Sequence, residues 1–247
     1  MIRALILALL GASLSACAFN ARISPSGEET ERIGRSKVWV AAFYPFERFL
    51  AHEVLNRFLY RSHALQVYSF EGIWDPLPTL EAAALDGVQK RFAVPATLAR
   101  SHLDPAVFAK AMEDTRVEAL STFRRGEQES WMAKRTDALA VEAAAKGGEY
   151  LLEIWVQLSL GRASHFTGVS FTFNSWSRLI RLDTQAVVWC KPGMAEAKGP
   201  EVEDIKEYAA NDLALFKETF AKVAAKFCDD VDADLDVLYG APLDRRN

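Results

Sequence analysis

The chain has 247 residues, of which 50% are hydrophobic and 25% are charged, and its formal net charge at pH 7 is −4. This length is enough for one sizeable core, and a slightly acidic balance without a basic patch argues against nucleic acid as a partner. After residue 17 no segment approaches the roughly 20 apolar residues that cross a bilayer, so we expect a globular domain and not a helical channel.

The N-terminal segment begins with Arg3 and an apolar run over residues 4–10, and it ends in Leu-Ser-Ala-Cys at residues 14–17. This tetrapeptide resembles the signal of bacterial lipoproteins. The resemblance implies that a diacylglyceryl group is attached to the thiol of Cys17, that the chain is cut between Ala16 and Cys17, and that the freed amine is acylated. Residues 1–16 are then a signal peptide. An ordinary secretory signal, or a short membrane span, with an incidental cysteine is the alternative.

A lipidated cysteine places the protein at a membrane through its acyl chains, because two or three chains together hold stably. Ala18 stands where inner-membrane lipoproteins of enteric bacteria carry Asp, and this resemblance favours the outer membrane, facing the periplasm. Pro25, Gly27 and a charged stretch indicate that residues 17–36 are the lipidated cysteine and a flexible linker. Residues 37–247 are expected to form a single periplasmic domain.

The first half of this domain begins with a β-rich run at residues 38–44, which predicts a buried strand. Apolar residues at helical intervals predict a helix over residues 47–60, and alternation predicts a strand over residues 65–70. Residues 79–146 are rich in Ala, Glu, Lys and Arg and read as a helical insertion, although residues 86–101 are ambiguous.

Two helices within the insertion carry terminal signals. Asp104 followed by Pro105 is typical of an N-cap and a first helical residue, and it predicts a helix that runs to about residue 120. A second helix is expected from about residue 127 to residue 146, because Gly147 and Gly148 provide a C-terminal stop.

The second half of the domain reads as a three-strand antiparallel meander followed by a helix. The strands are expected at residues 150–160, 169–182 and 186–190, with a polar tip at 161–168 and a tight turn at Asp183 and Thr184. A surface loop over residues 191–200 leads to an amphipathic helix that covers the sheet and carries apolar residues three or four apart from Ile205 to Phe227.

These elements predict an α+β fold: a mixed or antiparallel sheet of about five strands, covered by helices, with a helical insertion in the middle. Residues 143–189, which include AAAKGGEYLLEIWV and RLIRLDTQAVVW, resemble a group of envelope lipoproteins. The group includes the N-terminal domain of TolB-type proteins, the curli secretion lipoprotein, lipoprotein activators of peptidoglycan synthases and the lipoprotein of Pel polysaccharide export. The resemblance implies a protein that binds partner proteins or its own copies. The turn lacks the Gly common in that group, so its type stays open.

Motifs for catalysis or metal binding are incomplete in this sequence. His52 and Glu53 begin a zinc-protease pattern, but Asn56 stands where the second histidine is needed. Residues 168–172 lack the second Gly of a nucleophile elbow. Isolated histidines and the absence of a Cys-x-x-Cys or phosphate-loop pattern predict no catalytic residue, no metal and no cofactor.

Two alternatives concern the remaining reactive groups. Glu149, Glu153 and Asp183 are carboxylates that could form a glycosidase pair, although the sequence gives no distance between them. Cys190 and Cys228 lie in an oxidising compartment, and whether they are bridged stays open. If the expected helix packs back on the strand as a continuous rod, it carries Cys228 too far for a bridge.

The hairpin around residues 161–178 is the candidate contact surface, because aromatic side chains beside adaptable polar groups often make protein contacts. The residues concerned are Phe166, Phe171, Phe173, Asn174 and Trp176. Burial of one face under the helices and insertion into a membrane are the alternatives. We therefore expect a non-catalytic docking or assembly factor for a secretion, polysaccharide export or peptidoglycan system. An envelope glycan or peptidoglycan hydrolase and a lipid or small-ligand carrier stay open.

Overall fold

The structure is a computed structural model that describes residues 25–44, 48–57, 60–92, 96–121, 138–162, 169–198 and 205–239. Its strands are β1 (Val38–Phe43), β2 (Arg48–Arg57), β3 (Tyr60–Ser69), β4 (Ala96–Leu98), β5 (Tyr150–Arg162), β6 (Ser170–Arg181) and β7 (Ala186–Lys198). Its helices are α2 (Gly27–Ile33), α3 (Leu77–Phe92), η1 (Ala99–Ser101), α4 (Pro105–Ser121), α6 (Ala138–Ala145), η2 (Ile205–Ala209), η3 (Asn211–Leu213) and α7 (Ala214–Tyr239).

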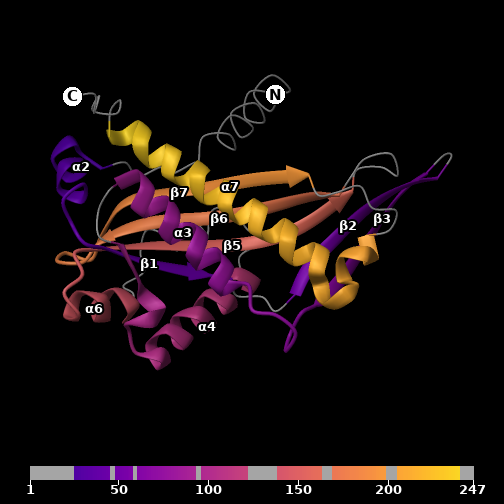
Figure 1. Cartoon of the computed structure of the whole chain (residues 1–247), viewed down its shortest axis with the longest axis horizontal. Helices are drawn as coiled ribbons and strands as arrows, with labels where there is room; N and C mark the ends of the chain where they lie inside the picture. The colour runs from indigo at the N-terminus through magenta and orange to yellow at the C-terminus, as the bar shows by residue number, and fades with distance from the viewer. Residues whose placement is uncertain are drawn as a thin grey trace, which may run out of the picture.

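The seven strands form one mixed sheet in which β5 is central (Figure 1). On one side β5 pairs antiparallel with β6 along almost its whole length, and β6 pairs antiparallel with β7. On the other side the first half of β5 pairs parallel with β1 and its end pairs parallel with β2. The antiparallel hairpin of β2 and β3 extends the sheet beyond β1, and β4 pairs with β1 at an edge. The predicted α+β class with a helix-covered mixed sheet is confirmed.

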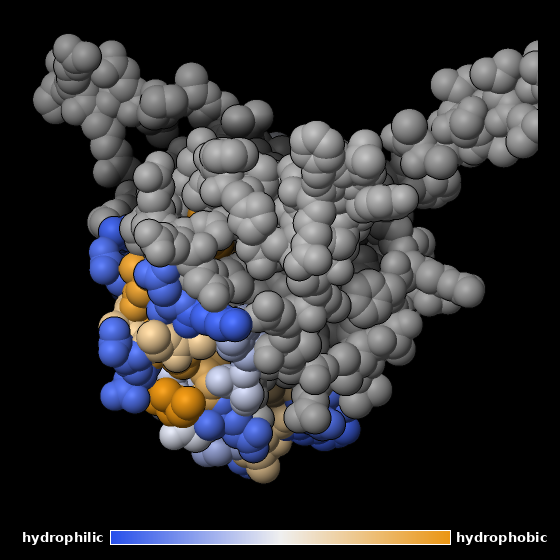
Figure 2. All heavy atoms as spheres, turned by 90° about the vertical axis from the view of Figure 1, so that its right-hand side faces the viewer, coloured by the Kyte–Doolittle hydropathy of each residue, from blue (hydrophilic) through white to orange (hydrophobic). Residues whose placement is uncertain are grey.

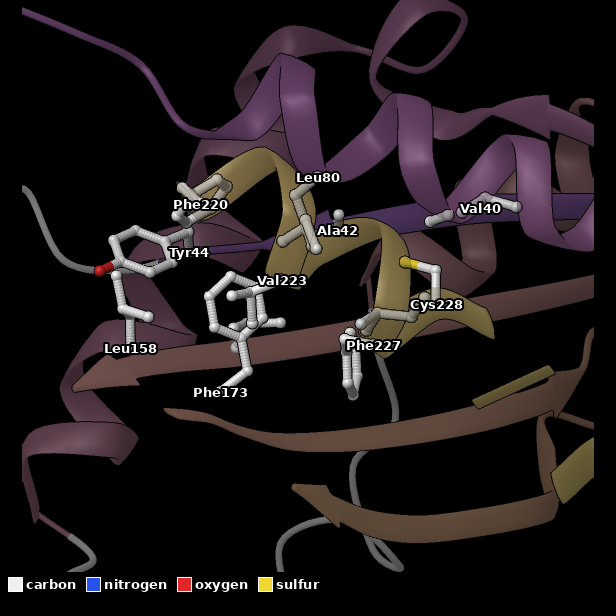
Figure 3. Close-up of a cluster of buried hydrophobic side chains, with 14 of the residues drawn as sticks. Val40, Ala42, Tyr44, Leu80, Leu158, Phe173, Phe220, Val223, Phe227 and Cys228 are labelled. Atoms are coloured by element: carbon white, nitrogen blue, oxygen red, sulfur yellow. The ribbon is translucent and has the colours of Figure 1, made fainter. Parts of the chain in front are cut away.

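Helices α3 and α7 cover one face of the sheet, where they lie side by side (Figure 1). The core on this face is aromatic: Phe173 on β6 points toward Val223 and Phe220 on α7 (Figure 3). The ring centroids of Phe173 and Phe220 are 5.0 Å apart, a separation at which tilted aromatic pairs add to the free energy of burial. The predicted role of the last helix, covering the sheet with its apolar stripe, is confirmed.

Helices α4 and α6 supply the core of the opposite face. The ring of Phe43 on β1 stacks on Phe108 of α4 with centroids 5.5 Å apart. A carboxylate oxygen of Glu142 on α6 accepts a hydrogen bond from the backbone N–H of Asp104, the residue that precedes α4. Because β1 packs against helices on both faces, all six of its residues are buried, as predicted for the run at residues 38–44.

The two predicted helix ends in the middle of the chain are confirmed. The Asp104 carboxylate accepts a hydrogen bond from the N–H of Ala106 at 2.8 Å, and Pro105 is the first residue of α4. After α6, Gly147 takes a left-handed φ of +78°, and the N–H of Gly148 donates to the carbonyl of Ala143. Residues 122–137, which include the whole first half of the expected helix at 127–146, lie outside the described residues.

The helix expected over residues 47–60 is wrong in its described part, because residues 48–57 form β2 and Tyr60 begins β3. Its apolar residues do recur at helical intervals, but the backbone pairs with β3 along its whole length and with β5 at Leu50–Glu53. These pairings satisfy the main-chain donors and acceptors of β2. The pairing with β5 joins residues more than 100 positions apart, and such tertiary pairing overrides a local helical pattern.

The surface loop expected over residues 191–200 is also wrong in its described part, because β7 continues through Pro192 and Gly193 to Lys198. The last helix begins later than expected. Residues 205–213 form the short η2 and η3, and Asn211, Asp212 and Leu213 all have positive φ, so the regular helix begins at Ala214.

The middle of the chain contributes to both layers of the fold. Leu80, Ala84 and Val88 on α3 are at most 1% exposed and belong to the aromatic core, and β4 extends the sheet. The ambiguous residues 86–101 thus include the end of α3, β4 and η1. No helix in the described part of the chain is long and apolar enough to cross a membrane.

Candidate functional site

Of the five predicted contact residues of the hairpin, two are buried in the structure and three have no described side chain. Phe171 and Phe173 are 0% exposed in the core beneath α7, so for these two the burial alternative applies and not the partner contact. Asn174 and Trp176 lie in β6, but their side chains are outside the described part. Phe166 lies outside the described residues, as do Ala16 and Cys17 of the lipoprotein signal.

The three carboxylates of the hydrolase alternative each bind a neighbouring element of the fold. Glu149 Oε2 accepts a hydrogen bond from the backbone N–H of Lys37 at 2.8 Å. Glu153 pairs with Arg178, and Asp183 pairs with two arginines. These contacts join the start of β5 to the start of β1, β5 to β6, and α2 to the turn after β6. The carboxylates therefore contribute to the architecture.

The pair of Glu153 on β5 and Arg178 on β6 is buried within the sheet. The two residues are direct cross-strand partners, and Nε of Arg178 lies 2.5 Å from Oε2 of Glu153. Arg178 is only 2% exposed, and Cys190 on β7 is its partner on the other side. A charge buried this deeply requires its counter-charge. No disulfide joins Cys190 to Cys228, which is buried on α7.

Helix α2 lies just ahead of the first strand, where flexible linker was expected up to residue 36. The Ser26 hydroxyl oxygen accepts a hydrogen bond from the N–H of Glu29 at 3.2 Å, which caps the helix. Thr30 and Ile33 are buried against the domain, and Ile33 joins the aromatic core. Residues 26–36 are thus part of the folded domain in this structure.

A group of polar side chains fixes α2 to the sheet; we call this group the α2 clasp and define it as Glu29, Arg32, Tyr150, Arg181 and Asp183. The Tyr150 hydroxyl donates to Glu29 Oε1 at 2.6 Å, and Arg181 lies 2.7 Å from Glu29 Oε2. Asp183 pairs with Arg32 at 3.0 Å and with Arg181 at 2.9 Å. The clasp therefore joins α2 to the start of β5 and to the end of β6.

The contacts of the clasp favour the charged forms of Asp183 and Arg181 and the protonated form of Tyr150. Loss of solvation alone would raise the pKa of Asp183, but the hydrogen bond from Arg32 and the charges of Arg181 and Arg32 outweigh it and hold this pKa below its ordinary value. The hydrogen bond with Glu29 raises the pKa of Arg181. Burial raises the pKa of Tyr150, and the contact with Glu29 raises it further, so the hydroxyl stays protonated and donates.

The sequence held one signal of this helix that the linker interpretation passed over. Ser26 followed by Glu29 matches the capping-box spacing S-x-x-E. The Ser26 half of the box forms in the structure, whereas the Glu29 side chain binds Tyr150 and Arg181. The partners of Glu29 are more than 120 residues away in sequence, so the clasp itself had no local signature.

The outer edge of β7 is the second feature of interest. Among the described strands, β7 pairs only with β6, and it presents its other edge along thirteen residues. Pro192 lacks an N–H, which suits an edge strand because it leaves one fewer donor to satisfy. A long unpaired edge can recruit another strand through main-chain hydrogen bonds.

Few large hydrophobic side chains are exposed among the described residues. Ile73 and Val141 are the large hydrophobic residues there that are strongly exposed, at 54% and 48%. Figure 2 shows one face of the molecule, on which hydrophobic residues are interspersed with hydrophilic ones. Glu81 on α3 is buried and pairs with Arg100 at 2.7 Å; burial raises the pKa of Glu81, and Arg100 opposes this in part.

Comparisons with known proteins gave structural likeness only. No family model and no curated protein matches the sequence. A PelC dodecamer from Paraburkholderia phytofirmans is similar over 79% of this chain and 88% of that chain, at 11% identity and a TM-score of 0.34. A hypothetical protein from Chlamydia trachomatis is similar over 84% and 99%, at 8% identity and a TM-score of 0.44. Lipoprotein GNA1162 from Neisseria meningitidis is similar over 77% and 99%, at 8% identity and a TM-score of 0.32. At these values the likeness carries no argument about function.

Proposed function

We propose that this protein is a lipid-anchored outer-membrane protein that faces the periplasm and acts as a non-catalytic docking or assembly factor of the cell envelope. The Leu-Ser-Ala-Cys tetrapeptide at residues 14–17 supports the anchor, because it ends the apolar run at the position of a lipoprotein cleavage site. Acyl chains on Cys17 would hold the domain at the membrane.

The observation that carries the docking role is the edge of β7. An edge of thirteen residues spans roughly 40 Å, which is long enough for an extended segment of a partner to add as a further strand. The partner is an envelope protein or a second copy of this chain. Either partner would bind through the same main-chain donors and acceptors of β7, so the proposed site is the same in both cases.

Site-specific photo-crosslinking in living cells tests the docking role. A photoreactive amino acid replaces Met194 in β7, and the matched control replaces Ala225, which is exposed on α7. We expect an adduct from position 194 and none from position 225. An adduct of twice the protomer mass identifies a second copy, and any other mass identifies another envelope protein. Equal adducts at both positions, or none at position 194, would contradict the docking role of β7.

Labelling with radioactive palmitate tests the anchor separately. The wild-type chain is expected to take up label and to fractionate with outer membranes, whereas the Cys17→Ser variant takes up none. Label that persists in the variant would place the acyl chain elsewhere. An unlabelled wild-type chain would remove the anchor from the proposal.

A further inference from the structure

We infer that the end of the domain formed by α2 and the turn between β6 and β7 faces the lipid bilayer, and that the opposite end of the sheet points away from it. This inference rests on the proposed lipid anchor. The occupant of this face is a lipid surface, and the argument depends on where the anchored chain enters the folded domain.

The chain between the anchor and the domain is short. Nine residue steps join Cys17 to Ser26, the N-cap of α2. A fully extended chain covers at most about 31 Å in nine residues. If the domain instead began at Ser36, where the predicted linker ends, nineteen steps would reach about 65 Å. Because α2 is part of the folded domain, the maximum distance between the anchored Cys17 and the domain is about half of what the predicted linker would allow.

The point of attachment is fixed to the sheet. Thr30 and Ile33 are buried, Glu29 binds Tyr150 and Arg181, and Arg32 binds Asp183. Helix α2 thus has apolar and ionic contacts with the domain. An anchor attached to α2 is therefore held near the start of β5 and the end of β6. The backbone adds a further link at this end, where the N–H of Leu182 donates to the carbonyl of Glu149 at 2.9 Å.

The opposite end of the sheet lies well beyond this attachment. Figure 1 shows α2 at one end of the long axis and the hairpin of β2 and β3 at the other. From its start near α2, β5 runs for thirteen residues, or roughly 40 Å, before it ends beside β2. The far end cannot approach the bilayer unless the domain lies flat on it.

This orientation also defines the direction of the β7 edge. Residue Ala186 follows the turn that α2 contacts, so this end of β7 is proximal to the membrane and Lys198 is distal. A strand that docks on β7 would then stand across the periplasm and not along the bilayer surface.

Energy transfer from the protein to lipids tests the orientation. The lipidated protein is purified from membranes and reconstituted into vesicles that contain an acceptor dye on the lipid headgroups. A donor dye is attached at Thr184→Cys, in the turn beside α2, or at Glu71→Cys, in the loop after β3; both positions are exposed. Glu71 follows Phe70, which packs on Tyr44 just after β1, so it lies on the order of 20 Å farther from α2 along the strand direction. Cys190 and Cys228 are buried, and the unsubstituted chain measures any labelling of them.

We expect several-fold stronger transfer from position 184 than from position 71. Equal transfer from both positions, or stronger transfer from position 71, would overturn the inference while leaving the anchor intact. Protein that does not bind the vesicles would instead remove the proposed anchor. The variant Glu29→Ala, which loses both clasp contacts of Glu29, is expected to reduce transfer from position 184, whereas Glu28→Ala, an exposed neighbour on the same helix turn, is expected to leave it unchanged. Equal transfer in these two variants would show that α2 does not set the distance.

Discussion

Removal of one partner from the buried pair Glu153–Arg178 tests how the centre of the sheet is stabilised. In the variant Glu153→Leu the guanidinium of Arg178 keeps its charge at 2% exposure and loses a carboxylate at 2.5 Å. Breaking a buried ion pair in this way costs about 3–5 kcal/mol of the free energy of unfolding. This is a large part of the 5–15 kcal/mol that is typical of a whole domain.

The double variant Glu153→Leu/Arg178→Met provides the control, because an apolar pair of similar volume carries no unpaired charge. It is expected to be more stable than Glu153→Leu alone. Urea unfolding followed by tryptophan fluorescence measures each free energy on protein that lacks residues 1–17, since Trp39 and Trp155 are buried and report on the core. A Glu153→Leu variant within about 1 kcal/mol of wild type, or a double variant no more stable than Glu153→Leu alone, would refute this reasoning.

Two further predictions concern the end of the sheet near α2. Gly148→Ala is expected to lower the free energy of unfolding by about 1–3 kcal/mol in the same urea assay, because an added Cβ would overlap the buried indole ring of Trp39. An unchanged unfolding midpoint would contradict that contact. Because folding lowers the pKa of Asp183, its contribution to stability is complete above the ordinary pKa of 3.8 and is lost as the pH falls through the lower pKa of the folded state. The thermal unfolding temperature of Asp183→Asn is therefore expected to change less with acidification than that of wild type. Parallel acid profiles would show that the clasp does not titrate through Asp183.

The parts of the fold that sequence predicted are those with local causes. The meander of β5, β6 and β7 pairs segments that are neighbours in sequence, and the start of α4 is set by Asp104 and Pro105 within a few residues. The turn between β6 and β7 spans residues 182–185, and Gln185 takes the positive φ of 54° that a Gly would otherwise supply. A non-Gly residue at this position gives no clear turn signal, which is why the type stayed open.

The parts that sequence did not predict have causes far away in the chain. Segment β2 has a local pattern that favours a helix, but it forms a strand that pairs with the neighbouring β3 and, more than 100 residues away, with β5. Helix α2 is too short to be stable alone, and its fixed position depends on Tyr150 and Arg181. For the candidate contact surface, alternation correctly placed Phe171 and Phe173 on one face, but which face of a hairpin is buried depends on where α7 packs.

Mass spectrometry of the N-terminal peptide, from protein purified from native membranes, tests the lipid anchor most directly. The account predicts that the mature chain begins at Cys17 and that its thiol and amine carry acyl groups. A chain that retains Met1, or an unmodified thiol at Cys17, would contradict the anchor, and with it the orientation of the domain at the membrane.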